Sequence, residues 1–417
     1  MILPIIIVIA VLIAAYLLLV FNSVWVYALF DRALKNVRDY LPNSYELPRY
    51  FARTPAGTVD TAARWAGWDG WYFFMFPDDR SLPVKMIRAS IMTGLYGLDG
   101  VDNAQALPPG VSPFDAVEHL VLLPSEVFDP AGGIEKANFL FHRYLPKRRA
   151  LTMKTGALDV SITGPDPLTS KMSELYGRVE GAWPHYKFNF VQPQAQIAIS
   201  VSYHAEDIVW WADVPQVFTY FASFGTYEGT LKYVRRLNEE GGAAAPAEEM
   251  TAIRGRGGFE HGFSRRPFSF NILWSPLRLI TTLIPSFHPV RYHYELLIGD
   301  NGLHGGFMLA RGFGIDFRNR GGFYLNGKYV PVQSIEVEYI EYESGVAGKQ
   351  SGKRAAAFPR KWKVRAATTE GFLEYDSVRE WPPPAISSNM TYYNFTFSGS
   401  YKGQPANGRG YGEYLSI

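Results

Sequence analysis

The residues with the clearest capacity for chemistry lie in one glycine-rich stretch, residues 256–266, where an acid and an imidazole stand between glycines and phenylalanines. If this stretch is extended, Phe259, His261 and Phe263 share one face of the strand. Glu260 then lies on the other face. A histidine between two phenyl rings would occupy an apolar pocket, where it is suited to proton transfer because it titrates near neutral pH. The alternative is a core histidine bonded to a backbone carbonyl.

A second group of ionisable residues occupies the segment Tyr292–Ile298. His293 and Glu295 are two residues apart, so they share a face if this segment is a strand. If that face meets His261, one pocket contains two imidazoles and a carboxylate, with Arg265 beside them. A buried glutamate would then act as an acid and a histidine as a base. The alternatives are a Glu295 that pairs with an arginine across the sheet and a His293 with a structural role.

Other chemistries have little support in the sequence. A metal site made of His261, His293 and Glu295 lacks the closely spaced pair of ligands on one helix or loop that would indicate it. The glycine-rich segment Arg254–Gly258 precedes a strand rather than a helix, so it does not predict a phosphate-binding loop. The absence of cysteine excludes disulfides and thiol catalysis. We therefore expect no metal and no cofactor.

The elements that must position these residues are predominantly strands. Aromatic residues make up 15% of the 417-residue chain, and Gly (39) and Pro (28) are plentiful, which favours aromatic strands separated by turns. The length suits two domains. Charge is nearly balanced, with 41 Lys and Arg against 39 Asp and Glu, so no nucleic-acid partner is expected.

The N-terminal segment, residues 1–30, carries no charged side chain. Its almost wholly aliphatic part, Ile5–Phe21, is long enough to cross a bilayer. It lacks the basic start of a cleavable signal peptide, so it predicts a transmembrane helix that anchors the chain. Arg32 and Lys35 follow it, which places the main body in the cytoplasm, at a bacterial inner membrane. The alternative is an uncleaved export signal.

The C-terminal part of the chain contains clear hairpin signals, at Asp300–Gly302 and at Asn326–Gly327. Alternating segments such as Ser334–Tyr342 bring the expected number of short antiparallel strands to seven or eight. Such a set predicts a closed or nearly closed barrel, a fold that holds one small apolar ligand in its mouth or lumen. Upstream, the aromatic run Trp65–Phe76 is expected to be a buried strand, with a lipid-contacting patch as the alternative.

Five motifs along the chain resemble, in the same order, those of the carotenoid 1,2-hydratase-like superfamily (hydroxyneurosporene synthase, AttH-like). They are Gly258–His261, Tyr292–Gly302, Phe323–Val330, Phe358–Val364 and Gly399–Glu413. The resemblance covers residues 156–417 and implies a mainly β fold of two tandem lipocalin-like antiparallel β-barrels behind the N-terminal transmembrane helix. The expected parts are an anchor (1–30), a juxtamembrane helix and linker (31–60), a first barrel (61–237), a flexible linker (238–250) and a second barrel (251–417).

The resemblance also implies roles for particular residues. His261 matches the family's alkene-protonating histidine, and Glu295 falls where its acid lies. Two positions depart from the pattern: Phe263 stands where the hydratases have tryptophan, and His293 where they have an aromatic residue. The expected catalytic residues are His261, Glu295 and Glu260. The expected substrate-binding residues are Phe263, Arg265, His293, Tyr294, Tyr227 and Tyr411.

These features together predict a membrane-anchored enzyme that takes a terpenoid, polyketide or lipid-like molecule from the bilayer. Its chemistry would be acid–base hydration, cyclisation or isomerisation without a cofactor. Two alternatives stay open, because a fold does not determine a function. One is a lipid- or pigment-binding protein without turnover, with a carotenoid as one such pigment. The other is a structural subunit of a membrane-protein complex.

Overall fold

The computed structural model describes most of the chain from residue 66 onward. The described residues are 9, 11, 12, 14, 66–80, 82, 86–93, 117–122, 139–144, 149–154, 157–165, 172–182, 184–192, 197–214, 218–235, 238–239, 242–243, 247–265, 290–312, 315–344, 357–380 and 390–416. The expected anchor (1–30), apart from four helical residues, and the expected linker (31–60) lie outside them. In the described part of the chain, no helix is long and apolar enough to span a membrane.

The first part of the fold is one antiparallel sheet with the strand order β4-β3-β2-β1-β13-β10-β9-β8-β7-β6-β5. The aromatic run predicted to be a buried strand is β1, with Phe73 and Phe74 fully buried, so that prediction is confirmed. The strands are β1 (Ala66–Pro77), β2 (Ile87–Thr93), β3 (Val117–Leu122), β4 (Phe139–Tyr144), β5 (Arg149–Lys154), β6 (Ala157–Pro165), β7 (Met172–Ala182), β8 (His185–Gln192), β9 (Ile197–Val214), β10 (Phe218–Arg235) and β13 (Ala247–Arg265).

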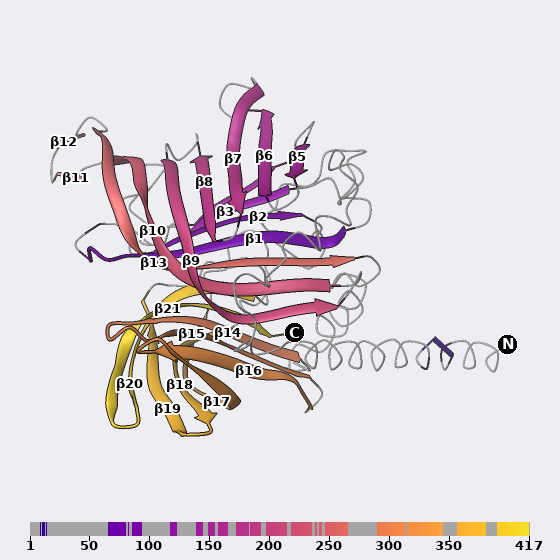
Figure 1. Cartoon of the computed structure of the whole chain (residues 1–417), viewed down its shortest axis with the longest axis vertical. Coiled ribbons are helices and arrows are strands. Elements are labelled where there is room, and N and C mark those ends of the chain that lie inside the picture. Colours follow the sequence, from indigo (N-terminus) through magenta and orange to yellow (C-terminus); the bar gives the residue numbers. More distant parts are fainter. Residues whose placement is uncertain are drawn as a thin grey trace.

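This sheet curls around an aromatic core. Phe73 on β1 and Phe188 on β8 stack with ring centroids 4.5 Å apart, although three strands separate β1 from β8 in the sheet. Phe259 on β13 packs against Phe73 and against Tyr186 at the same centroid separation. The steep crossing of β7 and β8 over β1 and β2 is visible in Figure 1. Within the described residues, β4 and β5 are the two edges, so the part for which the sequence predicted a first barrel is seen there as a curled sheet.

The strand that carries His261 corrects one expected boundary. The sequence placed it at the start of the second barrel, after a flexible linker at residues 238–250. In the structure this strand, β13, pairs with β10 from Phe218↔Ser264 to Arg235↔Ala247, and with β1 on its other side. The connection between β10 and β13 contains the two short strands β11 (Asn238–Glu239) and β12 (Gly242–Ala243). A Gly- and Ala-rich composition suits such a hairpin connection as well as a linker, which is why composition alone misplaced the boundary.

The C-terminal part forms a closed eight-stranded barrel, β14 to β21 in sequence order, as the hairpin signals predicted. Both turn signals are confirmed, with positive φ at Gly302 (84°), Asn326 (53°) and Gly327 (72°). Buried residues from all eight strands form its core. The strands are β14 (Val290–Gly299), β15 (His304–Gly312), β16 (Ile315–Leu325), β17 (Lys328–Ser344), β18 (Ala357–Thr368), β19 (Gly371–Arg379), β20 (Met390–Tyr401) and β21 (Gln404–Ser416).

The sheet and the barrel pack directly on each other, with β14, β15 and β21 on the barrel side that meets the sheet (Figure 1). A Cβ atom at Gly258 of β13 would lie 3.5 Å from Leu296 Cδ1 of β14. Across the same junction, the Phe74 and Tyr411 rings are 4.3 Å apart, and His304 Nε2 lies 2.6 Å from Asp207 Oδ2. One face of β14 therefore points into the barrel and the other toward the sheet.

Candidate functional site

A buried histidine–glutamate pair lies inside the barrel, on β14. Strand alternation directs His293, Glu295 and Leu297 inward, while Tyr294 and Leu296 point to the sheet. His293 and Glu295 are 2% and 0% exposed. His293 Nε2 lies 2.7 Å from Glu295 Oε1. The shared face expected from their spacing is therefore present, and it brings the two ionisable groups into contact.

Two further donors converge on the same carboxylate. Trp362 Nε1 of β18 donates a hydrogen bond to Glu295 Oε1, and the Tyr375 hydroxyl of β19 donates to Oε2. The indole N–H can only donate, so Glu295 is the acceptor at that contact. A carboxylate that accepts from several donors in an apolar interior is compensated for its lost hydration and is held in one orientation.

The other ring nitrogen of His293 continues the chain of contacts. The Tyr339 hydroxyl of β17 lies 3.3 Å from His293 Nδ1. With Glu295 accepting from Nε2–H, Nδ1 of the neutral imidazole is free to accept the tyrosine proton. The Tyr339 hydroxyl, the His293 imidazole and the Glu295 carboxylate are then connected in series by hydrogen bonds. Many enzymes use this arrangement to activate a nucleophile or an acid–base group.

Burial controls the protonation of the tyrosines around the pair. It raises the pKa of Tyr375 well above 10.0, and the charge of Glu295 adds to that rise. Burial also raises the pKa of Tyr339, with smaller contributions from Tyr414, Tyr342 and Glu295. Both hydroxyls therefore keep their protons at neutral pH and act as donors.

The pair sits among aromatic rings. The His293 ring meets Tyr339 and Trp362 edge to face, at 5.7 and 5.9 Å between centroids. Trp362 in turn contacts Phe395 at 5.2 Å. Tyr339 also contacts Tyr414 at 5.5 Å, toward the barrel end where β14 begins and β17 ends. These surroundings exclude water from the pair and strengthen its electrostatic interactions.

Three of the expected site residues lie at the junction between sheet and barrel. Glu260 is 5% exposed, and Tyr294 and Tyr411 are buried. The Tyr411 hydroxyl donates to Glu413 Oε1 at 2.6 Å. The guanidinium of Arg88 lies 5.4 Å from the Tyr411 ring and its Nη2 lies 3.6 Å from Glu413 Oε1. The junction is thus a separate buried polar cluster on the outer side of the barrel wall.

The remaining expected residues belong to the first sheet. His261 pairs in register with Trp71 of β1 and Phe221 of β10. Phe263 and Arg265 follow it near the end of β13, where only the backbone is described. Tyr227 is buried in the sheet, and burial raises its pKa well above the usual value. The structure therefore brings His293 and Glu295 together and places His261 in the other half of the fold.

Sequence reasoning did not identify Tyr339, Trp362 and Tyr375 as partners of Glu295. A signal was present for two of them, because Tyr339 and Trp362 occupy the apolar face of alternating segments. Alternation shows that such residues point inward. It does not show which of them meet, because that depends on the register across β17, β18 and β19.

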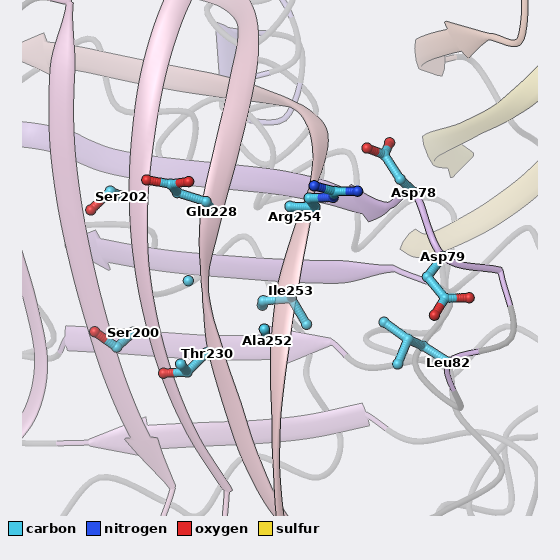
Figure 2. Close-up of a pocket in the computed structure, with 11 residues that line it drawn as sticks. Asp78, Asp79, Leu82, Ser200, Ser202, Glu228, Thr230, Ala252, Ile253 and Arg254 are labelled. Atoms are coloured by element: carbon cyan, nitrogen blue, oxygen red, sulfur yellow. The ribbon is translucent and has the colours of Figure 1, made fainter.

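A different kind of site is an open groove of about 880 Å³ on the outer face of the first sheet. Figure 2 shows Glu228 and Arg254 side by side on adjacent strands, with Asp78 beyond Arg254. Its other lining residues are Asp79, Leu82, Ser200, Ser202, Gly229, Thr230, Ala252 and Ile253. Seven of the eleven lining residues are polar or charged, which does not suit the apolar ligand expected from the sequence.

Two solved structures are similar to the chain, whereas family models and curated proteins do not match it. Among solved structures, it is similar to kievitone hydratase from Nectria haematococca, with 11% identity, a TM-score of 0.48, and coverage of 87% of this chain and 92% of the other. It is also similar to CghA, with 10% identity, a TM-score of 0.47, and coverage of 84% and 88%. Likeness at this level assigns no residue role.

Proposed function

We propose that the chain is an acid–base enzyme that acts, without a cofactor, on an apolar small molecule of the terpenoid, polyketide or lipid-like class. The observation that carries this proposal is the buried line of Tyr339, His293 and Glu295 inside an aromatic barrel. Burying a carboxylate and an imidazole is costly, so a buried pair of ionisable groups in direct contact is a candidate functional site.

The three residues have distinct roles in this proposal. Glu295 is a positioning residue that orients His293 through Nε2 and stabilises the imidazolium form. His293 accepts or returns a proton at Nδ1. The Tyr339 hydroxyl, which is less buried than the other two groups, passes that proton to or from the substrate. Aromatic faces around it would stabilise positive charge that develops on a protonated alkene.

The reaction class follows from what the site can supply. Hydration adds the elements of water, and isomerisation or cyclisation redistributes bonds within one molecule. None of these needs an oxidant or a reductant, and each can proceed by giving one proton to carbon and removing another. A substrate would approach from the barrel end that carries Tyr339, Tyr342 and Tyr414, whose rings are in contact.

The test begins with identification of the substrate. Organic extraction of the purified full-length protein and mass spectrometry give the bound compound, and its conversion is then followed for the wild type, His293→Ala and Tyr339→Phe. We expect both variants to lose about 100-fold or more in kcat while they still bind the compound. Fully active variants would contradict the roles given to His293 and Tyr339. Binding of the compound without turnover by the wild type would show that the protein is a carrier.

Membrane attachment is a second, separate proposal that rests on the uncharged segment 1–30. We propose that it forms a single transmembrane helix with the folded part on the cytoplasmic side, so that an apolar substrate reaches the barrel from the bilayer. Cell fractionation compares the full chain with residues 31–417. The full chain is expected in the membrane fraction and the shortened chain in the supernatant, and equal distribution of the two would contradict an anchor.

A further inference from the structure

Two histidines stand opposite each other on the outer face of the first sheet. His185 of β8 pairs in register with His204 of β9, and both side chains are exposed. Their Nδ1 atoms are 3.1 Å apart, and the ring centroids are 4.6 Å apart with 30° between the planes. The two rings therefore present the same nitrogen to one point in space.

This separation matches the span of a metal chelate. Imidazole nitrogens bind zinc at about 2.0–2.1 Å. Two nitrogens 3.1 Å apart, each about 2.05 Å from a common ion, enclose an angle of about 98° at that ion. The value lies between the right angle of square-planar or octahedral sites and the tetrahedral angle. Little movement of either side chain is needed, because adjacent strands already fix the distance.

Charged and polar residues lie on the same face of the sheet as the two histidines. Glu206 follows His204 by two residues on β9, on the same face of the sheet. Its two carboxylate oxygens accept hydrogen bonds from Thr226 (3.1 Å) and Arg256 (3.3 Å), which hold it in place. Ser202, two residues to the other side of His204, lines the polar groove (Figure 2). A carboxylate in an ion pair with Arg256, and a polar groove, thus flank the two imidazoles.

We propose that His185 and His204 form a binding site for a divalent transition-metal ion of the zinc or copper type. Neutral imidazole is the commonest metal ligand in proteins. Within the described residues no cluster of three or more His, Asp, Glu or Cys side chains is arranged around one metal position. The ion therefore has two protein ligands, and water or a ligand from the groove completes its coordination. The site is independent of the proposed reaction in the barrel.

The test is isothermal titration of the untagged full-length protein with zinc chloride, repeated with copper(II) chloride. His119 and His142 also stand opposite one another, on β3 and β4, so all proteins carry His119→Ala and His142→Ala. We expect one equivalent of metal to bind. His185→Ala and His204→Ala should each weaken binding about tenfold or more.

Asn189→Ala, on the same strand and face as His185 and outside the groove, is the matched control, and it should bind metal as the unsubstituted protein does. Circular dichroism of each variant establishes that the sheet is intact. Wild-type affinity in both histidine variants, or no saturable binding in the starting protein, would overturn the proposal. The two rings would then be a neutral hydrogen-bonded pair.

Discussion

Glu295 is the residue on which the candidate site depends. Its side chain is fully buried and is bonded to His293, Trp362 and Tyr375. The spacing of His293 and Glu295 was enough to predict that they share a face, because alternation along a strand is a local property. The donors from other strands could not be predicted, since Trp362 and Tyr375 reach Glu295 only through barrel closure and strand register.

The hydrogen bond from Tyr375 can be measured against a matched tyrosine. Tyr375→Phe should lower the free energy of unfolding by about 1.5–3 kcal/mol, the usual contribution of a hydrogen bond to a charged group. Tyr393 is equally buried, at 3% exposure, and within the described residues its hydroxyl has no hydrogen-bond partner. Tyr393→Phe should therefore change stability little. Urea denaturation of both variants gives the comparison, and equal losses would show that Tyr375 does not stabilise Glu295.

At the scale of elements, strand pairing separates residues that the sequence grouped together. One face of β14 directs His293 and Glu295 into the barrel, and the opposite face directs Tyr294 toward the sheet. The turns at Asp300–Gly302 and Asn326–Gly327 were predictable because their residues favour positive φ. The position of β13 could not be predicted from the sequence. Its partners, β1 and β10, are set by long-range pairing rather than by any feature within the strand.

One glycine in the barrel wall is required by close strand approach. A Cβ atom at Gly399 of β20 would overlap the backbone of Glu374 and Tyr375 on β19. Gly399→Ala should therefore displace Tyr375 and lower the unfolding free energy by about 1–3 kcal/mol. The neighbouring exposed substitution Ser400→Ala is the control and should have little effect. Thermal unfolding followed by near-ultraviolet circular dichroism distinguishes the two, and a wild-type transition for Gly399→Ala would disprove the close approach.

At the scale of the whole molecule, the curled sheet and the barrel are joined by buried polar contacts as well as apolar ones. His304 bonds to Asp207, and the Tyr329 hydroxyl donates to the Val209 carbonyl at 3.1 Å. Arg88 lies beside Glu413 at the same junction. Composition and turn signals were enough to predict a mainly β protein with a C-terminal barrel. They carried no information on how the two parts pack, because that depends on which faces are left uncovered once each has folded.

The junction should make stability depend on pH. Burial raises the pKa of Glu413 above its ordinary value of 4.5, and this outweighs the lowering effect of Arg88. The folded chain then holds the Glu413 proton more tightly than the unfolded chain. This contribution to stability is complete below the unfolded pKa and is lost as the pH rises through the raised folded pKa.

Glu413→Gln removes that titration. The unfolding free energy of the wild type minus that of the variant should therefore fall as the pH is raised from 4.5 toward neutrality. Urea denaturation at a series of pH values measures this difference. Glu338→Gln, an exposed substitution on β17, should keep the wild-type pH dependence. A difference that stays constant with pH for Glu413→Gln would contradict the assignment.

The most direct measurement of the central proposal is deuterium transfer from solvent. The compound extracted from the protein is incubated with enzyme in heavy water, and the product is analysed by mass spectrometry and NMR. If Tyr339 and His293 deliver a proton to carbon, wild-type enzyme forms product with one deuterium at a single carbon, and His293→Ala forms that deuterated product at least about 100-fold more slowly. A product that forms without deuterium, or formation of the deuterated product at the wild-type rate by the folded His293→Ala variant, would contradict acid–base catalysis by this pair.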